Sequence, residues 1–309
     1  MLNYLARRSV LALGLLLFVS LVAFALIFLA GDPAVRIAGE GASAAEADRI
    51  RTNLGFDRPI IVQYLSWLAS IFRGDLGHSL YFDQPVFGIL WPRLQITLLL
   101  GAAAIAFTVC LAIPLGVAAG WHRNSWIDRV ALIIAVVGQA MPTFWFSLLL
   151  VILLGIEFPI LPTSGSETWQ HFVMPTIVLG YSSAPAVMRL TRSGIIAALD
   201  QDYIRTARAM GIPDRTVVLK YALRSALIPL VSVSAAQFGY MLAGSVVVES
   251  VFAINGAGRL AWESILRSDL PTVQALILCF STLYVILTLA ADVAKAWLDP
   301  RIRLGDGGA

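Results

Sequence analysis

The residues that most often carry out catalysis do not form a catalytic pattern in this sequence. His78, His122 and His171 are too widely separated to gather a metal ion on one helix face. No GxSxG, HExxH or phosphate-binding GxxxxGK[ST] sequence occurs, so the signatures of a hydrolase and of a nucleotide-binding loop are missing. Cys110 and Cys279 fall in apolar stretches, where a free thiol is usual. We therefore expect no enzymatic activity, no metal site and no disulfide in this chain.

A different kind of chemistry is concentrated in residues 202–229, DYIRTARAMGIPDRTVVLKYALRSALIP. Burying the charged side chains of this segment in lipid would cost on the order of 20 kcal/mol. The segment must therefore contact water or a protein partner. Its pattern also predicts order, because Gly211 is placed to end one helix and Pro213 with Asp214 to begin another. We interpret the segment as a docking element at a membrane surface.

Polar residues inside apolar segments form a second group of candidates: Gln139, Ser232, Ser234, Gln237 and Tyr240. Such side chains either hydrogen-bond between helices or line an aqueous path, and the sequence leaves both roles open. Asp292 is a lone carboxylate near the end of the last apolar segment. We favour an interfacial acid paired with Lys295 over a functional site, because the lysine is one helical turn away.

The composition determines the class of protein that must position these residues. The chain has 309 residues, of which 59% are hydrophobic and 13% are charged. A soluble domain is nearer 45 to 50% apolar and about 25% charged. The apolar runs are long enough for helices and lack the alternation of a membrane barrel, so we predict an all-α integral membrane protein. The net charge of +3 is too small to indicate a nucleic-acid partner.

Six apolar runs predict six membrane-spanning helices, at about residues 10–30, 96–119, 130–156, 171–190, 227–248 and 272–289. The basic residues gather on one side of these spans: Arg7, Arg8, Arg123, Arg129, Arg189, Arg192, Lys295, Arg301 and Arg303. The positive-inside rule therefore places both termini in the cytoplasm. Met141 and Pro142 predict a kink in the third span. Apolar residues at helical spacing over 60–72 predict an amphipathic helix in the long first outer loop.

These runs divide the chain into three parts. Residues 1–93 hold the first span and the long outer loop with its amphipathic helix, and residues 94–300 form the core with the charged segment near 203–211. Residues 301–309 form a cytoplasmic tail.

Several short motifs, taken in order, match a known family over nearly the whole chain. They are LARRSVLAL, the GDP after the first span, LGFDRPIIVQYLSWL with RGDLGHSL, IPLGVAAG, MPTFWF, RLTRSGI, DYIRTARAMGI, VVVESVFAINGAGRL and LDPRIR. The chain thus resembles the inner-membrane permease subunits of binding-protein-dependent ABC importers, in the dipeptide, oligopeptide and nickel group, and within it the first-permease (B-type) subunit. The resemblance implies a type I importer permease fold and a multi-pass protein of the bacterial inner membrane.

The resemblance also implies a role for the charged segment. A coupling helix at 203–210, ended by a glycine, would enter a groove of a cytoplasmic ATPase. The implied coupling residues are Tyr203, Arg205, Thr206, Ala207, Arg208, Met210 and Gly211. The general family signature has Glu-Ala-Ala where this chain has Arg205, Thr206 and Ala207. The docking role is therefore carried over without any salt bridge from the missing glutamate.

The resemblance implies a set of partners as well. They are a homologous second permease, two ATP-binding-cassette ATPases that hold ATP and magnesium, and an extracytoplasmic binding protein; this chain itself would bind no cofactor. Glu249, Asn255, Gly256 and Gly258 are expected to face the outer mouth, where the binding protein delivers substrate. The expected substrates are dipeptides or longer peptides, with nickel or a metal chelate as the alternative. An autonomous secondary transporter or channel is the alternative of a different class.

Overall fold

Helices account for the regular structure of the described residues, 2–29, 31–38 and 43–298 of the computed structural model. Within these ranges, the one β-type pairing is an isolated antiparallel bridge between His78 and Pro85. The all-α class is therefore confirmed. The predicted tail, 301–309, lies outside the described residues.

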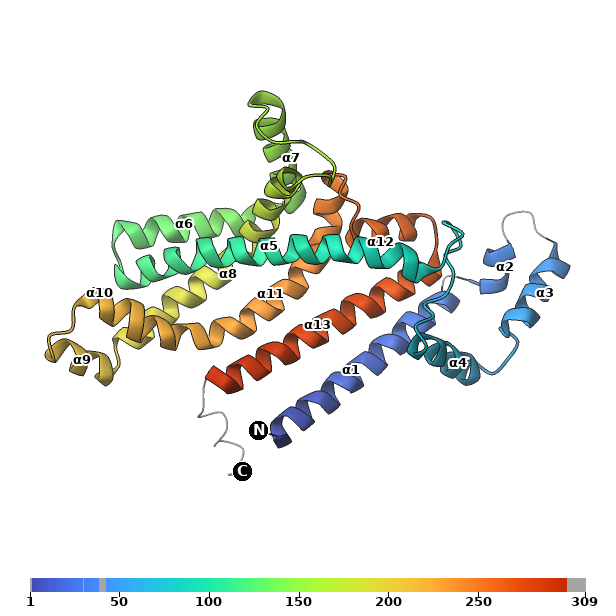
Figure 1. Ribbon diagram of the computed structural model, residues 1–309, viewed down its shortest axis with the longest axis horizontal. Coiled ribbons are helices and arrows are strands. Elements are labelled where there is room, and N and C mark those ends of the chain that lie inside the picture. Colours follow the sequence, from blue (N-terminus) through green and yellow to red (C-terminus); the bar gives the residue numbers. More distant parts are fainter. Residues whose placement is uncertain (1, 30, 39–42, 299–309) are drawn as a thin grey trace.

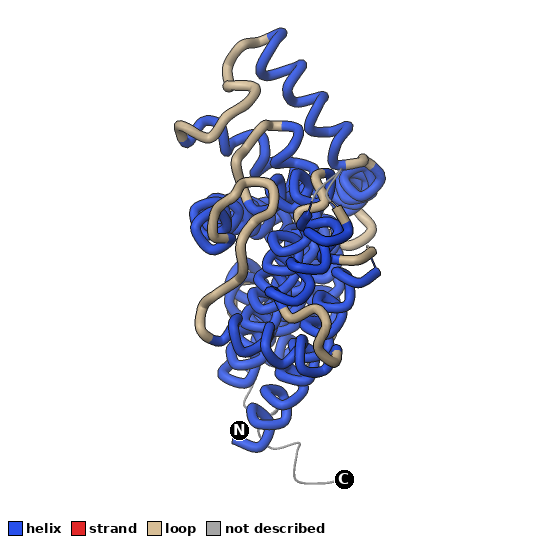
Figure 2. Tube along the Cα trace, turned by 90° about the vertical axis from the view of Figure 1, so that its right-hand side faces the viewer, coloured by secondary structure: helices blue, strands red, loops and turns tan. Residues whose placement is uncertain are grey.

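Long helices lie at the positions of the predicted spans. They are α1 (Leu2–Leu29), α5 (Val86–Trp121), α6 (Trp126–Ala140) followed by α7 (Thr143–Leu150), α8 (Val173–Leu199), α11 (Leu223–Val251) and α13 (Leu270–Leu298). All except α7 run in a similar direction through one bundle (Figure 1), and several are seen nearly end-on when the molecule is turned by 90° (Figure 2). The first turn of α1 and the last turn of α13 lie at the same end of the bundle as expected for termini on one side of the membrane (Figure 1).

Length and apolar composition alone identify three of these helices among the described residues as able to cross a membrane: Ala6–Leu26, Val86–Trp121 and Leu270–Lys295. A fourth is added if the bent pair of α6 and α7 counts as one span. With 27 and 29 residues, α8 and α11 are also longer than the roughly 20 residues that a bilayer requires. Their place inside the bundle, between the apolar helices, supports their assignment as spans (Figure 1).

The predicted third span, 130–156, is not one helix. α6 ends at Ala140, and the following α7 with the π-helix η1 (Val151–Glu157) is turned by 102° from it. Pro142 has no N–H, so the carbonyl group of Gly138 loses its normal helical partner at this point. The sequence predicted a kink here, and the structure corrects its size: the chain turns through more than a right angle.

Glycines let α5 and α8 approach each other closely. A Cβ atom added at Gly116 would lie 2.6 Å from the Cβ of Thr191, and one added at Gly120 would lie 2.8 Å from the Cβ of Ile195. From the other side, a Cβ at Gly180 would lie 2.7 Å from the carbonyl oxygen of Ala104. Small residues spaced in this way permit close backbone contact between membrane helices, where packing rather than water exclusion drives association. α5 and α8 therefore form the centre of the bundle.

The first outer loop folds into three short helices, α2 (Pro33–Ala38), α3 (Ala44–Leu54) and α4 (Ile60–Phe72). The guanidinium group of Arg51 binds the carboxylate of Asp32, and this hydrogen bond holds the pKa of Asp32 below its ordinary value. A helix is present over the predicted range, 60–72, as α4. It packs on α1, where Tyr64 shares a hydrogen bond of 2.8 Å with Ser20.

Candidate functional site

The charged segment forms two short helices at the end of the bundle that holds the termini (Figure 1). α9 spans Asp202–Ala209, and α10 (Asp214–Thr216) leads through the π-helix η3 (Val217–Ala222) into α11. Gly211 follows α9 with φ +78°, the left-handed conformation that favours glycine. Its N–H donates to the carbonyl of Arg208 at 2.9 Å, and that of Ile212 donates to Ala207 at 3.2 Å. The helix that the sequence predicts at 203–210 is therefore present, with each end one residue earlier.

α9 is held to the bundle along one face and exposed on the other. Ile204 and Ala207 are buried in an apolar cluster with side chains of α5, α8 and η3, including Val117 and Ile195. The remaining predicted coupling residues are exposed: Tyr203, Arg205, Thr206, Arg208, Met210 and Gly211. The structure therefore assigns Ala207 to the attachment of the helix and leaves a mixed basic and apolar surface facing outward.

Ion pairs orient the charged side chains of this surface without adding much stability. Arg205 lies 3.3 Å from Asp202 on the same helix, and Arg208 reaches Asp214 across the turn at 2.9 Å. Exposed pairs of this kind contribute roughly 0 to 1 kcal/mol each. The Arg208–Asp214 pair links α9 to the start of α10, whereas the Arg205–Asp202 pair lies within α9.

A more buried ion pair joins α8 to α6. Arg192 of α8 donates through Nε and Nη2 to the two carboxylate oxygens of Asp128, at 2.6 and 2.7 Å, and Asp128 is buried. The backbone N–H of Asn124 donates to the same carboxylate at 3.0 Å. This two-point pair fixes the start of α6 against α8. The sequence identified Arg192 only as a marker of topology, because its partner is 64 residues away.

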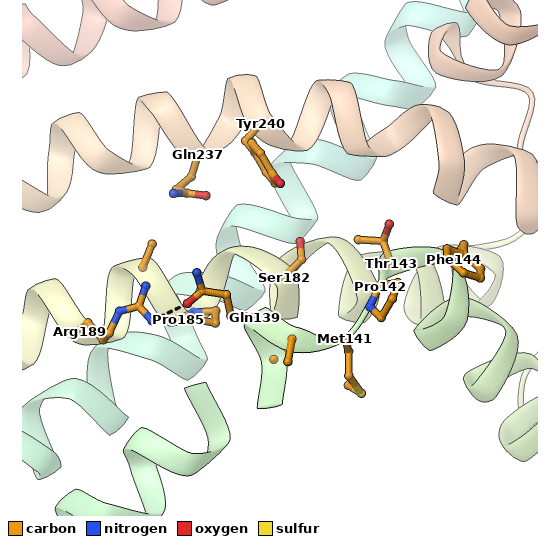
Figure 3. A pocket seen from close by; sticks show the side chains of 13 residues that line it. Gln139, Met141, Pro142, Thr143, Phe144, Ser182, Pro185, Arg189, Gln237 and Tyr240 are labelled. Carbon is orange, nitrogen blue, oxygen red and sulfur yellow. Dashed lines mark hydrogen bonds between the residues drawn. The ribbon is translucent and has the colours of Figure 1, made fainter. Parts of the chain in front are cut away.

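A cavity of about 590 Å³ opens beside the break between α6 and α7. α6, α7, α8 and α11 contribute its walls (Figure 3). Its polar side chains are Gln139, Thr143, Ser182, Arg189, Gln237 and Tyr240. The lining therefore offers amide, hydroxyl and guanidinium groups together with the apolar surface of Met141, Pro142, Phe144 and Pro185.

The structure brings together three of the five residues predicted for a translocation path. Gln139, Gln237 and Tyr240 line the cavity. Ser234 is partly buried on α11 and is not among the lining residues. The side chain of Ser232 lies outside the described residues.

Sequence reasoning missed Arg189, which it assigned to topology. Arg189 lines the cavity and donates from Nη1 to Oε1 of Gln139 at 2.6 Å. The apolar run predicted at 171–190 ends beside Arg189, so hydropathy carried no signal for this residue, whereas α8 continues for ten residues beyond it to Leu199. A basic residue inside a long helix that lines a cavity is a functional candidate by default.

The prediction for the outer mouth needs correction. Glu249 has no exposed surface, and Gly256 and Gly258 are buried with it, so Asn255 is the one exposed member of the four predicted residues. Oε1 of Glu249 accepts a hydrogen bond from Thr97 at 2.7 Å, and Oε2 accepts one from the N–H of Arg259 at 2.8 Å. The carboxylate thus joins α11 to α5 and to the start of α12 (Ala257–Leu266).

The two glycines make room for this carboxylate. A Cβ at Gly256 would lie 2.4 Å from the carboxyl carbon of Glu249, and one at Gly258 would lie 2.9 Å from Oε2. The NGAG sequence is therefore explained by contact with a buried acid inside the protein.

Asp292 is also more buried than an interfacial acid would be. Its side chain is 6% exposed and lies 3.9 Å from Lys295, as predicted, and 3.4 Å from Nε of Arg8 on α1. The contact with Arg8 joins the first and last helices and was not predicted, because these residues are at opposite ends of the chain.

The long apolar helices thus form a bundle with an open polar cavity and a short helix displayed at one end. The fold is that of a type I ABC importer permease. It is similar to a chain of the MetNI methionine ABC transporter in an inward-facing conformation, with a TM-score of 0.59 and 17% sequence identity over 69% of this chain and 97% of that chain.

Sequence comparison supplies the family. Residues 112–304 match the family described as "Binding-protein-dependent transport system inner membrane component", and residues 1–101 match its N-terminal counterpart. The chain belongs to this family. It is 38% identical over 304 residues to the glutathione transport system permease protein GsiC of Salmonella typhi and to that of Escherichia coli strain K12, covering 98% of this chain and 99% of each relative. It is therefore a permease subunit of an ABC importer and a multi-pass protein of the bacterial inner membrane.

Proposed function

We propose that this permease forms half of the pathway for peptide-like solutes, including dipeptides, longer peptides and tripeptides of the glutathione type. The observation that carries the proposal is the cavity of about 590 Å³. Amide, hydroxyl and guanidinium side chains in its lining match the amide and carboxylate groups of a peptide. The names of the 38% identical relatives, which refer to glutathione transport, point to the same class of solute.

The other half of the pathway would come from a homologous second permease. Two partner ATPases would bind ATP and magnesium, and an extracytoplasmic binding protein would deliver the solute. In this arrangement α9 enters a groove of one ATPase, with Tyr203, Arg205 and Met210 on its exposed surface. Closure of the ATPase pair on ATP moves α9 and switches the cavity between the two sides of the membrane.

Uptake into proteoliposomes that contain the complete transporter and its binding protein tests the substrate class. We expect ATP-dependent uptake of a labelled tripeptide and of glutathione, and no uptake of a nickel–histidine chelate at the same concentration. Uptake of nickel alone would contradict the peptide assignment. Peptide uptake by this chain in liposomes without ATPases would contradict the importer mechanism.

Gly211 offers a sharp test of the docking role of α9. Gly211 and Gly74 both have positive φ, +78° and +85°, and a Cβ at either position would meet no atom within 4 Å. Valine should therefore cost a similar free energy at each, roughly 1 to 2 kcal/mol of backbone strain. Gly211 follows α9, whereas Gly74 follows α4 in the outer loop.

We expect Gly211→Val to reduce both co-purification of the ATPases and ATP-driven uptake by at least about tenfold. Gly74→Val should leave both close to the wild-type level. Normal assembly and transport in Gly211→Val would rule out the coupling role of α9. Equal losses in the two variants would show that instability, not coupling, is responsible.

A further inference from the structure

Arg189 brings a positive charge to the wall of the cavity. Its Nη1 donates to Oε1 of Gln139, the hydrogen bond drawn in Figure 3. None of the residues that line the cavity is acidic. Among the described residues, no carboxylate lies within ion-pair distance of Arg189. The charge is therefore oriented by a neutral amide and faces an open space.

A second arginine on the same helix shows the contrast. Arg192, one turn away, has both carboxylate oxygens of Asp128 within 2.7 Å and is neutralised by them. The charge of Arg192 is thus matched by a buried acid. Arg189 differs, because its partner supplies a hydrogen-bond acceptor and no negative charge.

A guanidinium group has five N–H donors in a planar fork, and the bond to Gln139 uses one of them. The others remain available for a ligand. Carboxylates bind this fork through two parallel hydrogen bonds, which adds both charge attraction and a defined orientation. An ionisable residue that a membrane protein keeps in a cavity commonly marks the path of its solute.

The opposite wall supplies groups for the rest of such a ligand. Gln237 and Tyr240 extend from α11 across the cavity from Arg189 and Gln139, and Ser182 lies further along α8, the helix that carries Arg189 (Figure 3). Amide and hydroxyl groups donate to and accept from peptide bonds without requiring a particular side chain. One end of the cavity thus offers a charged donor for a carboxylate, and the rest of the lining offers neutral polar groups for peptide bonds.

We propose that Arg189, positioned by Gln139, binds a free carboxylate of the solute during its passage, so that the permease favours solutes with an anionic terminus. The proposal rests on the assigned class of peptide-like solutes. It adds a selectivity step in the membrane that does not depend on the binding protein. Lysine at this position retains the charge but loses the two-point contact.

Direct binding tests this step. The membrane complex of permeases and ATPases is placed in lipid nanodiscs without the binding protein, and the Kd values of tritiated trialanine and of its C-terminal amide are measured by scintillation proximity. We expect Arg189→Gln to raise the Kd of the free acid at least about tenfold, as for loss of a charged hydrogen bond. The Kd of the amide should change less than about twofold, because it lacks the carboxylate. Arg189→Lys should be intermediate for the acid.

Arg129→Gln is the matched control, since it removes an exposed arginine of α6 that does not line the cavity. It should leave both Kd values unchanged. The proposal would be overturned if Arg189→Gln weakened binding of the acid and of the amide equally, or if it left the Kd of the acid unchanged. It would also be overturned if Arg129→Gln had the same effect as Arg189→Gln. Absence of trialanine binding to the wild type would also overturn it, whereas failure of the complete transporter to import any peptide would instead overturn the proposed function.

Discussion

Glu249 and Thr97 show how a few side chains fix the outer end of the bundle. The Thr97 hydroxyl donates to Glu249 at 2.7 Å and accepts from the N–H of Ala257 at 2.8 Å, and the same carboxylate accepts from the N–H of Arg259. One hydroxyl and one carboxylate thus satisfy two backbone donors at the start of α12. Buried donors left without acceptors destabilise a protein by roughly 1 to 3 kcal/mol.

We expect Glu249→Gln to lower the free energy of unfolding by about 1 to 3 kcal/mol, because the amide group replaces one of two acceptor oxygens with a donor. Thermal unfolding of the purified permease complex in detergent measures the effect. Glu167→Gln is the control, since its exposed carboxylate contacts His171 and should contribute roughly 0 to 1 kcal/mol. Equal melting temperatures for the two variants would contradict a structural role for Glu249.

Single residues were the least predictable level of this structure. The sequence identified Gln139, Gln237 and Tyr240 from their polarity within apolar runs. It placed Glu249 at an open mouth because polarity gives no information on a partner 152 positions away. Arg189 was interpreted as a topology marker for a related reason. A run of apolar residues does not show which face of a helix lines a cavity.

At the scale of elements, the close contact between α5 and α8 depends on glycines, which have no side chain. Gly120 lies so close to α8 that a Cβ would meet the Cβ of Ile195 at 2.8 Å and the carbonyl oxygen of Arg192 at 2.9 Å. Gly88, on the same helix, has no atom within 4 Å of its Cβ position. The two positions differ in tertiary packing and share their helical backbone.

Alanine at the two glycines should therefore have opposite effects. We expect Gly120→Ala to destabilise the protein by about 1 to 3 kcal/mol through overpacking. Gly88→Ala should be neutral or should stabilise α5 by up to about 1 kcal/mol, because alanine favours the helix. The melting temperatures of the two purified variants test this. A fall of similar size in both would indicate that helix propensity, and not the contact with α8, determines the result.

Elements were predicted well where apolar length determines them. The long helices lie where the runs predicted them, and the glycine after α9 ends that helix as expected. The turn of 102° between α6 and α7 was underestimated. Proline explains why the helix breaks, but tertiary contacts with α8, including the hydrogen bond of 3.1 Å from Tyr181 to the carbonyl of Ile134, determine how the segments then pack.

At the scale of the whole molecule, the bundle has two distinct ends. α9 and the first and last described turns of the chain lie at one end, whereas α2, α3, α4 and α12 lie at the other (Figure 1). The positive-inside rule assigns the first end to the cytoplasm. Arg205 and Asn255 are exposed at the two ends and mark opposite sides of the membrane.

Cysteine labelling tests this orientation. In a chain whose Cys110 and Cys279 are replaced by alanine, we expect Arg205→Cys to react with a membrane-impermeant maleimide in inside-out vesicles only. Asn255→Cys should react in right-side-out vesicles only. The reverse pattern would contradict the assigned topology, and labelling of both positions from one side would contradict an odd number of crossings between them.

The glycine-mediated contact of α5 with α8 also has a mechanical consequence. Backbones that touch without intervening side chains leave little compressible material between them, so the two helices behave as one stiff rod. Arg189 lies ten residues before the end of α8 at Leu199, about 15 Å along the helix axis, and α9 begins three residues beyond that end. We therefore expect a displacement of α9 to be carried along these two helices and to reach the guanidinium group of Arg189 as movement, with little of it absorbed as local strain.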